Sequence, residues 1–230
     1  MIKKLINALD EIVFPPLCAS CERRLLPEEK AICLNCIIRL PRTHNFMRPG
    51  NRAEQLMAGR IPFRRIASFC AFSKGGMLPP LIHKLKYSRA AEIGFLLGKL
   101  FGDDMVGSDF IRPIDFIVPV PLHPKREKKR GYNQAEIIAD GISESTFIPL
   151  NSSNLVRAIY NPTQTKKSKN QRWENVKGIF EVKDTNLFRE KHILLVDDVI
   201  TTGSTLEACG VALQKCTSIS ISIATLGEVM

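Results

Sequence analysis

The sequence predicts an α/β protein whose mostly parallel sheet is covered by helices on both faces, preceded by a small cysteine-containing module. After about residue 60, strand-like and helix-like segments alternate, which favours parallel strands joined by crossover helices. The strand-like segment that begins at Ile193 is continuously apolar, as expected for a strand buried on both faces. Two Cys-x-x-Cys pairs near the N-terminus predict the separate module.

Composition agrees with one domain plus a small module. The chain has 230 residues, of which 44% are hydrophobic and 24% charged, so it can bury a substantial core. No apolar run reaches the roughly 18 residues of a membrane span, and we expect no membrane insertion. Residues 2–13 predict a short amphipathic helix, and Asp10 and Glu11 break the apolar run that an export signal would need. A cytoplasmic protein is therefore expected.

The cysteines indicate a structural metal. Eleven residues separate two Cys-x-x-Cys pairs, which can place four thiolates around zinc. A closed set of four thiolates would hold the fold and perform no chemistry. A redox dithiol, or cysteines without a shared role, are the alternatives. The four predicted ligands are Cys18, Cys21, Cys33 and Cys36. The three remaining cysteines have apolar, periodic surroundings and are expected in the core: Cys70, Cys209 and Cys216.

We expect two domains, with a boundary near residue 60. Residues 1–60 would hold the N-terminal helix, the cysteine module and a basic linker, and residues 61–230 would form the α/β domain. The predicted strands cover 64–72, 115–122, 178–182, 191–200 and 218–226. The predicted helices cover 75–87, 90–105, 131–145 and 203–216.

The strongest functional signal is the stretch ILLVDDVITTGST, residues 193–205. Its strand runs into Asp197 and Asp198, which cannot be packed as core without a large desolvation cost, so we expect both at an exposed strand end. The loop that follows is rich in hydroxyls and opens a helix, which is an anion site. Together they offer acceptors for a diol beside donors for a phosphate, the combination that a ribose 5-phosphate needs. The loop residues are Thr201, Thr202, Gly203, Ser204 and Thr205.

Three other interpretations of this stretch were weighed. A simple strand end with a helix cap needs no ligand. A P-loop NTPase would require G-x-x-x-x-G-K-[ST], which the chain lacks. A phosphoacceptor receiver domain would have its acidic pair near the start of the fold, whereas this pair lies in the last predicted strand but one.

A basic segment lies between the predicted strand 115–122 and the next helix. We expect it to be a loop at the carboxyl end of the strand, where ligands bind, although a run of charge is also typical of a solvated face. Its glycine and asparagine fit a backbone that turns towards a phosphate. The candidate residues are Lys125, Arg126, Lys128, Lys129, Arg130, Gly131 and Asn133. With a net charge of +10, the chain favours anionic partners such as phosphates or nucleic acid.

The stretch 193–205 resembles the 5-phosphoribosyl 1-diphosphate (PRPP) motif of type I phosphoribosyltransferases. The resemblance implies a type I phosphoribosyltransferase-like fold. It also implies that Asp197 and Asp198 hold the ribose hydroxyls with magnesium, and that residues 201–205 bind the 5-phosphate. The basic segment resembles the pyrophosphate loop of these enzymes. The polar stretch 160–177 resembles their mobile loop or lid, with a surface loop as the alternative; its working residues would be Gln164, Thr165, Arg172 and Asn175.

The order of the motifs resembles the competence protein F family from Cys18 to the end of the chain. The paired cysteines are followed by HKLKYSRAAEIGFLLGKL, VPVPLHPKREKKRGYNQA, QTKKSKNQRWENVKGIFEV and the PRPP motif. This resemblance implies a role in DNA uptake during natural transformation, with single-stranded DNA and DNA-uptake helicase or processing proteins as partners. It supplies neither the acceptor substrate nor catalytic residues. The alternative is a non-catalytic single-stranded-DNA-binding competence factor that uses PRPP only as a ligand.

Overall fold

The computed structural model describes residues 15–158 and 178–229. The predicted N-terminal helix and the whole of the predicted lid 160–177, with Gln164, Thr165, Arg172 and Asn175, lie outside these ranges. Within them, no helix has the length and apolar character that crossing a membrane requires.

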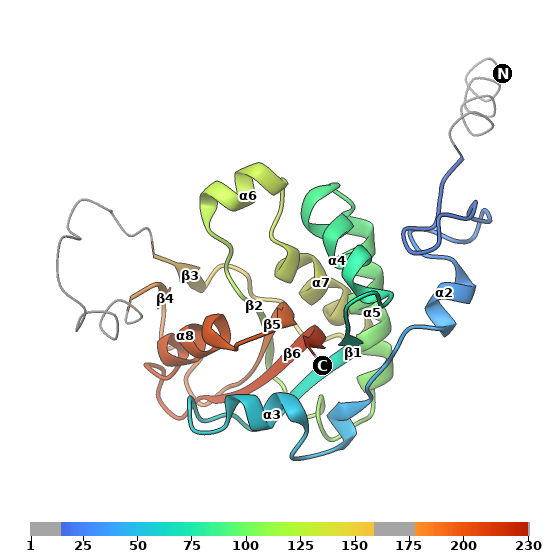
Figure 1. The fold of residues 1–230 in the computed structure, drawn as a ribbon. Helices are drawn as coiled ribbons and strands as arrows, with labels where there is room; N and C mark the ends of the chain where they lie inside the picture. Colours follow the sequence, from blue (N-terminus) through green and yellow to red (C-terminus); the bar gives the residue numbers. More distant parts are fainter. Residues whose placement is uncertain (1–14, 159–177, 230) are drawn as a thin grey trace.

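A four-stranded parallel sheet forms the centre of the molecule (Figure 1). Its strand order is β1 (Ile66–Phe72), β6 (Ser220–Val229), β5 (His192–Ile200) and β2 (Phe116–Pro119). A separate antiparallel pair consists of β3 (Leu155–Arg157) and β4 (Phe180–Val182). The mostly parallel sheet predicted from the alternating sequence pattern is confirmed.

Helices cover both faces of the sheet. Alternate side chains of β5 point to opposite faces, so Leu194 and Val196 join one hydrophobic cluster while Ile193 and Leu195 join the other. The first face is covered by α4 (Leu78–Tyr87), α5 (Ala91–Met105) and α7 (Gln134–Thr146). The second is covered by α3 (Arg52–Met57) and α8 (Ser204–Leu213). The central strand carries its side chains into two separate cores, which explains its unbroken apolar run.

The basic segment is a helix, so the predicted loop over 125–130 is wrong. Helix α6 (Pro124–Arg130) begins with proline, and the His123 Nδ1 atom caps it by accepting a hydrogen bond from the Lys125 backbone N–H at 3.1 Å. Lysine, arginine and glutamate have high helix propensity. The helix ends at Gly131, whose φ of 91° lies in the left-handed region that favours glycine. The run of charged residues was the reason for predicting a loop, but the capping residues and the helix propensities of these side chains favour a short helix.

Residues 42–57 pack along the outer edge of β1. The Thr43 backbone N–H donates to the Phe69 carbonyl at 2.9 Å, and Asn51 Nδ2 donates to the Ile66 carbonyl at 2.8 Å. Glu54 Oε1 accepts from the Ile66 backbone N–H at 3.0 Å. These bonds satisfy an edge strand that would otherwise expose its backbone. The predicted boundary near residue 60 stays a prediction, and these contacts favour one nearer residue 40.

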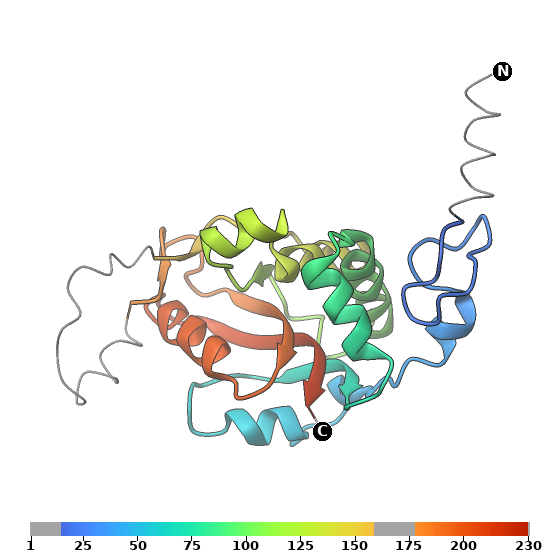
Figure 2. The same ribbon diagram turned by 45° about the horizontal axis from the view of Figure 1, so that its top comes forward.

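The cysteine module contains the short helix α2 (Leu34–Ile38), and the short 3-10 helix η1 (Asn45–Met47) leads from it towards the sheet. The turned view shows the module beside α4 and α5, on the opposite side of the molecule from α8 (Figure 2). Glu22 of the module lies 3.7 Å from Lys84 of α4, measured from Oε1 to Nζ. The module therefore contacts the helices of the first face.

Candidate functional site

The two adjacent carboxylates lie inside β5. Parallel pairing with β6 continues through Val199 and Ile200, so the strand runs two residues past Asp198. Both aspartates are consequently half-buried, and the expectation that they occupy an exposed strand end is wrong. The Asp198 backbone N–H donates to Asp197 Oδ1 at 2.8 Å, which fixes the orientation of the first carboxylate.

Burial and the neighbouring Asp198 charge raise the pKa of Asp197 to about 7. Lys86 opposes this shift, because its Nζ lies 2.6 Å from Asp198 Oδ2 and brings a positive charge to the pair. Lys86 belongs to the last turn of α4, which is tied to the sheet domain by a 2.6 Å hydrogen bond from the Tyr132 hydroxyl to the Leu85 carbonyl. The lysine is therefore the ion-pair partner of Asp198.

A cavity of about 260 Å³ opens beside the carboxylates. Four cations line it together with the two aspartates: Lys86, Arg126, Arg130 and Arg157. Burial, and secondarily the charge of Arg126, lowers the pKa of Arg157. Because cations outnumber carboxylates around the cavity, its field favours a strongly anionic ligand.

The predicted pyrophosphate residues divide into two sets. Arg126, Arg130 and Asn133 line the cavity with the aspartates. Asn133 also has a structural task, because its Oδ1 caps α7 through the Ala135 N–H at 3.1 Å and its Nδ2 donates to the Val120 carbonyl at 3.0 Å. The remaining predicted residues are not among those that line the cavity: Lys125, Lys128, Lys129 and Gly131.

The hydroxyl-rich loop forms a second, smaller hollow next to the cavity. All five predicted loop residues line it, and Thr201 and Thr205 also line the larger cavity. Gly203 precedes α8 with a φ of 75°, and a Cβ at this position would overlap the Met57 sulfur. Both the backbone conformation and the close approach of Met57 therefore favour glycine here. Arg60 donates to the Thr202 carbonyl from outside. The hydroxyls and the start of α8 are thus presented towards an anion.

Sequence reasoning did not assign Lys86 and Arg157 to the site. Lys86 follows the apolar positions Leu81, Ile82 and Leu85 of α4, which places it at the border of the buried helix face. This periodicity indicates a lysine near the core, but it does not reveal which strand the lysine meets. Arg157 ends β3, which leads into residues outside the described ranges.

The four cysteines of the module converge as predicted. All four sulfurs lie within 4.8 Å of one another, and the Cys21 and Cys33 sulfurs are 3.7 Å apart. Sulfurs that sit about 2.3 Å from a tetrahedral zinc are separated by roughly 3.8 Å. The Cys33 backbone N–H also points at the Cys18 sulfur at 3.3 Å. The donor set is therefore compatible with zinc.

The three other cysteines, and the two histidines His83 and His123, belong to neither the cavity lining nor the cysteine cluster. Cys70, Cys209 and Cys216 are buried in the core, as expected. His83 is exposed on α4, and His123 caps α6. Neither histidine is among the residues that line the cavity beside the aspartates.

Comparison with known proteins agrees with this arrangement. The family model described as "Phosphoribosyl transferase domain" matches residues 128–229, which include the acidic pair and the hydroxyl-rich loop. The fold and the site thus define a protein with a phosphoribosyltransferase domain. The DNA utilization protein YhgH of Escherichia coli (strain K12) is 31% identical over 193 residues, covering 83% of this chain and 80% of that protein.

Two competence proteins match a shorter region. Competence protein F of Haemophilus influenzae is 41% identical over 101 residues, covering 43% of this chain and 44% of that protein. Competence protein ComFC of Bacillus subtilis is 37% identical over 111 residues, covering 48% and 43%. The chain belongs to the competence protein F family, which includes these relatives.

Solved structures show a more distant likeness. A purine phosphoribosyltransferase from Pyrococcus horikoshii is 18% identical with a TM-score of 0.35, covering 63% of this chain and 76% of that one. A glutamine PRPP amidotransferase from Bacillus subtilis is 20% identical with a TM-score of 0.41, covering 59% of this chain and 26% of that one. The family assignment rests on the sequence relatives and the motif.

Proposed function

We propose that this chain binds PRPP with magnesium and transfers its phosphoribosyl group to an acceptor during the handling of incoming DNA. The observation that supports the proposal is the cavity lined by the Asp197–Asp198 pair and three arginines, together with the adjoining hollow of the hydroxyl-rich loop, which shares Thr201 and Thr205 with it. A ribose diol, a 5-phosphate and a pyrophosphate need these three kinds of partner in one place.

Each group has a proposed role. Asp197 and Asp198 accept hydrogen bonds from the ribose 2- and 3-hydroxyls, and residues 201–205 bind the 5-phosphate through backbone N–H groups and hydroxyls. Arg126, Arg130 and Arg157 neutralise the pyrophosphate. The proposed lid residues Gln164, Thr165, Arg172 and Asn175 would exclude water from the reacting sugar. The basic residues of α6 that do not line the cavity would contribute only to the positive electrostatic potential around it.

The transfer is a substitution at the ribose C1 atom. A nucleophilic nitrogen of the acceptor forms a bond to C1, the bond between C1 and the pyrophosphate oxygen breaks, and its electron pair leaves with the pyrophosphate. The proton of the acceptor nitrogen passes to solvent. Magnesium, when bound, supplies positive charge for the oxygens of the pyrophosphate. The arginines stabilise the negative charge that grows on the leaving group, and no protein nucleophile is needed.

The DNA context comes from relatives. Two of them are named "DNA utilization protein" and "Competence protein", and these names support a role for this chain in DNA uptake. The same names favour one alternative, a non-catalytic single-stranded-DNA-binding protein of natural transformation that uses PRPP only as a ligand. Zinc in the cysteine module would be structural under either function.

The test separates binding from transfer. Calorimetry with PRPP and magnesium should show binding by the natural chain, and the double substitution Asp197→Asn with Asp198→Asn should weaken it at least about tenfold, since hydrogen bonds to charged groups are worth roughly 1.5–3 kcal/mol. Asp140→Asn, on the exposed surface of α7, is the matched control. Equal affinity in the double variant would refute the diol role.

Transfer is then measured as pyrophosphate release from labelled PRPP in the presence of magnesium and a panel of nucleobases and amines. Release with one acceptor supports the transferase. PRPP binding without release for any acceptor supports the ligand-only alternative.

A further inference from the structure

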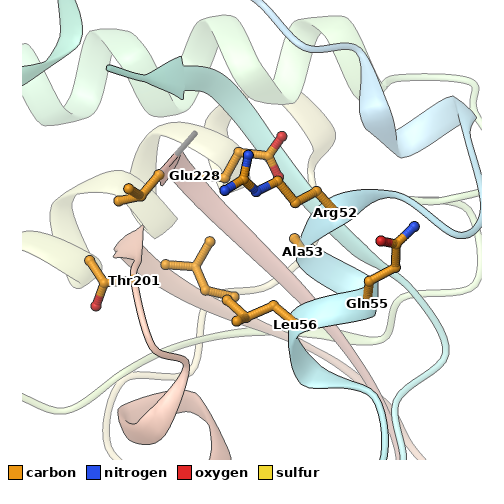
Figure 3. A pocket seen from close by; sticks show the side chains of 8 residues that line it. Arg52, Ala53, Gln55, Leu56, Thr201 and Glu228 are labelled. Atoms are coloured by element: carbon orange, nitrogen blue, oxygen red, sulfur yellow. The ribbon is translucent and has the colours of Figure 1, made fainter. Parts of the chain in front are cut away.

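A further hollow, distinct from the cavity beside the aspartates and from the hollow of the hydroxyl-rich loop, adjoins the proposed PRPP site. It has a volume of about 400 Å³ and lies between α3 and the carboxyl ends of β5 and β6 (Figure 3). Thr201 lines this hollow, the cavity beside the aspartates and the small loop hollow, so all three meet at one residue. A group held here would lie next to a sugar phosphate held there.

Glu228 is the acidic residue that lines this hollow. It stands at the end of β6, paired in register with Ile200 on one side and Ala71 on the other, and only 8% of its surface is exposed. It also lines a neighbouring hollow of about 600 Å³ that residues 41–51 enclose. The carboxylate therefore sits where two hollows join.

The hydrogen-bonding capacity of this carboxylate is largely unused. Among residues 15–158 and 178–229, its only recorded side-chain hydrogen bond comes from Asn45 Nδ2 at 3.3 Å, and it takes part in no ion pair within 4.0 Å. Asn45 is itself held by the Ser68 backbone N–H, which donates to its Oδ1 at 2.8 Å. A carboxylate has about four acceptor sites, so a fixed, buried glutamate with one neutral donor is ready to accept more.

Burial raises the pKa of Glu228, while Arg52 and Asn45 act against the shift. Figure 3 shows Arg52 entering the hollow from α3, so its positive charge favours the ionised carboxylate. Three apolar side chains also line the hollow: Leu56, Ile200 and Val229. Leu56 and Val229 keep 37% and 40% of their surface exposed, which leaves apolar area for a flat ring to cover.

We propose that this hollow is the acceptor pocket, and that it takes a planar heterocycle that presents two adjacent N–H donors to the Glu228 carboxylate. The guanine edge, with a ring N–H beside an exocyclic amino group, has this pattern. Hypoxanthine has only the ring N–H, and adenine and cytosine place a lone pair where the second donor is needed. This inference rests on the proposed function and names the class of acceptor.

The test uses the full chain with magnesium and ribose 5-phosphate, which has the sugar and the 5-phosphate of PRPP but no pyrophosphate to lose, and equilibrium dialysis against labelled guanine and labelled hypoxanthine. We expect guanine to bind at least tenfold more tightly than hypoxanthine. Glu228→Gln keeps the shape of the side chain but replaces one acceptor oxygen by a donor, so guanine affinity should fall at least tenfold and the preference should shrink to less than threefold. Glu144→Gln, on the exposed surface of α7, should change neither value.

PRPP binding in the same variants keeps the result interpretable. Glu228→Gln that binds PRPP within twofold of the natural chain is folded, and a loss of guanine binding then belongs to the pocket. PRPP binding by the natural chain without guanine binding, or with equal affinity for hypoxanthine, would overturn the inference and leave the proposed function standing. Guanine binding without PRPP binding would overturn the proposed function and the acceptor role together.

The same edge is present in a nucleic-acid strand, and one further arm distinguishes that source. A guanine-rich single-stranded oligonucleotide competes with labelled guanine in the dialysis. Retention of guanine binding at saturating oligonucleotide supports a pocket for the free base. Binding of the oligonucleotide through Glu228, with no binding of free guanine, would contradict the acceptor role.

Discussion

At the scale of single residues, Asp197 has the most unusual environment in the proposed site. Its carboxyl group is half-buried beside a second carboxyl group, and burial together with the Asp198 charge raises its pKa to about 7. The folded protein therefore holds a proton on Asp197 between about pH 4 and pH 7 that the unfolded chain has released. Ionisation in this window costs stability, which falls as the pH rises and is lowest above pH 7.

Asp197→Asn should remove this cost. We expect the variant to be more stable than the natural chain by at most about 4 kcal/mol at pH 8, since the pKa of Asp197 is raised from 3.8 to about 7 and one pKa unit corresponds to about 1.4 kcal/mol. The advantage should shrink as the pH approaches 4, where both proteins are neutral at this position. Urea unfolding at a series of pH values measures it. An advantage that is constant with pH would contradict the raised pKa of Asp197.

The role of Lys86 depends on Asp198, a partner that is distant in the sequence. Its ammonium group neutralises Asp198 and contributes to the positive field of the cavity. Lys86→Met should therefore weaken PRPP binding about tenfold. Lys84→Met, two residues earlier on α4 and paired with Glu22, is the matched control and should leave the affinity unchanged. Titration calorimetry compares them, and equal affinities in the two variants would remove Lys86 from the site.

The sequence allowed Asp197, Asp198 and residues 201–205 to be proposed because they are contiguous and their chemistry is local. It did not reveal Lys86 or Arg157 as site residues, because pairing between α4 and β5 is a long-range contact that no local pattern encodes. It predicted a strand over 191–200 that contains the acidic pair, but it wrongly expected that end of the strand to be exposed, because burial there depends on long-range pairing with β6.

At the scale of elements, local signals identified most of the strands and helices. The apolar periods of α4, α5 and α7 and the unbroken run of β5 predict them within a few residues. Helix α6 was missed because its seven residues bury no side chain, so it has no apolar period to detect. The packing of residues 42–57 on β1 was also missed, because their polar composition is typical of a linker.

The cysteine module is the element that a single substitution tests best. Cys33→Ser removes one of four converging sulfurs, and structural zinc supplies folding energy, so zinc content should fall well below one equivalent and residues 15–40 should become sensitive to protease. No residue of 15–40 is among those lining the cavity beside the aspartates, so PRPP affinity should change less than twofold. Cys70→Ala, in the core beside β6, should keep its zinc. Retention of a full equivalent by Cys33→Ser would contradict the four-cysteine site.

At the scale of the whole molecule, the net charge of +10 predicts attraction to nucleic acid. Helix α6 exposes Lys128 and Lys129 outside the cavity, whereas Arg130 lines it. Substitutions on this one short helix can therefore test DNA binding, at Lys128 and Lys129, separately from PRPP binding, at Arg130. Single-stranded DNA would be held mainly by its phosphates, without preference for sequence.

We expect weak binding of single-stranded DNA that decreases steeply as salt rises. Lys128→Ala with Lys129→Ala should reduce the slope of log affinity against log salt by about 1.4, since each phosphate contact on a single strand contributes about 0.7. The affinity of this double variant for PRPP should stay within twofold of that of the natural chain, whereas Arg130→Ala should weaken PRPP binding. Fluorescence anisotropy of a labelled oligonucleotide measures the first effect. An unchanged slope would move the DNA contact away from α6.

The position of the acidic pair inside the sheet, described above, has a consequence for how the proposed site opens and closes. The backbone amides of Asp197–Ile200 that bond to β6 should exchange with deuterium only when the sheet itself opens, because β6 is a central strand. Amides of α6 should exchange orders of magnitude faster, because that helix buries no side chain. Under the proposed function, the carboxylates that would hold the sugar belong to the sheet, whereas the helix that would face the pyrophosphate buries no side chain. We therefore expect α6 to be the half of the site that is displaced more easily when the leaving group departs.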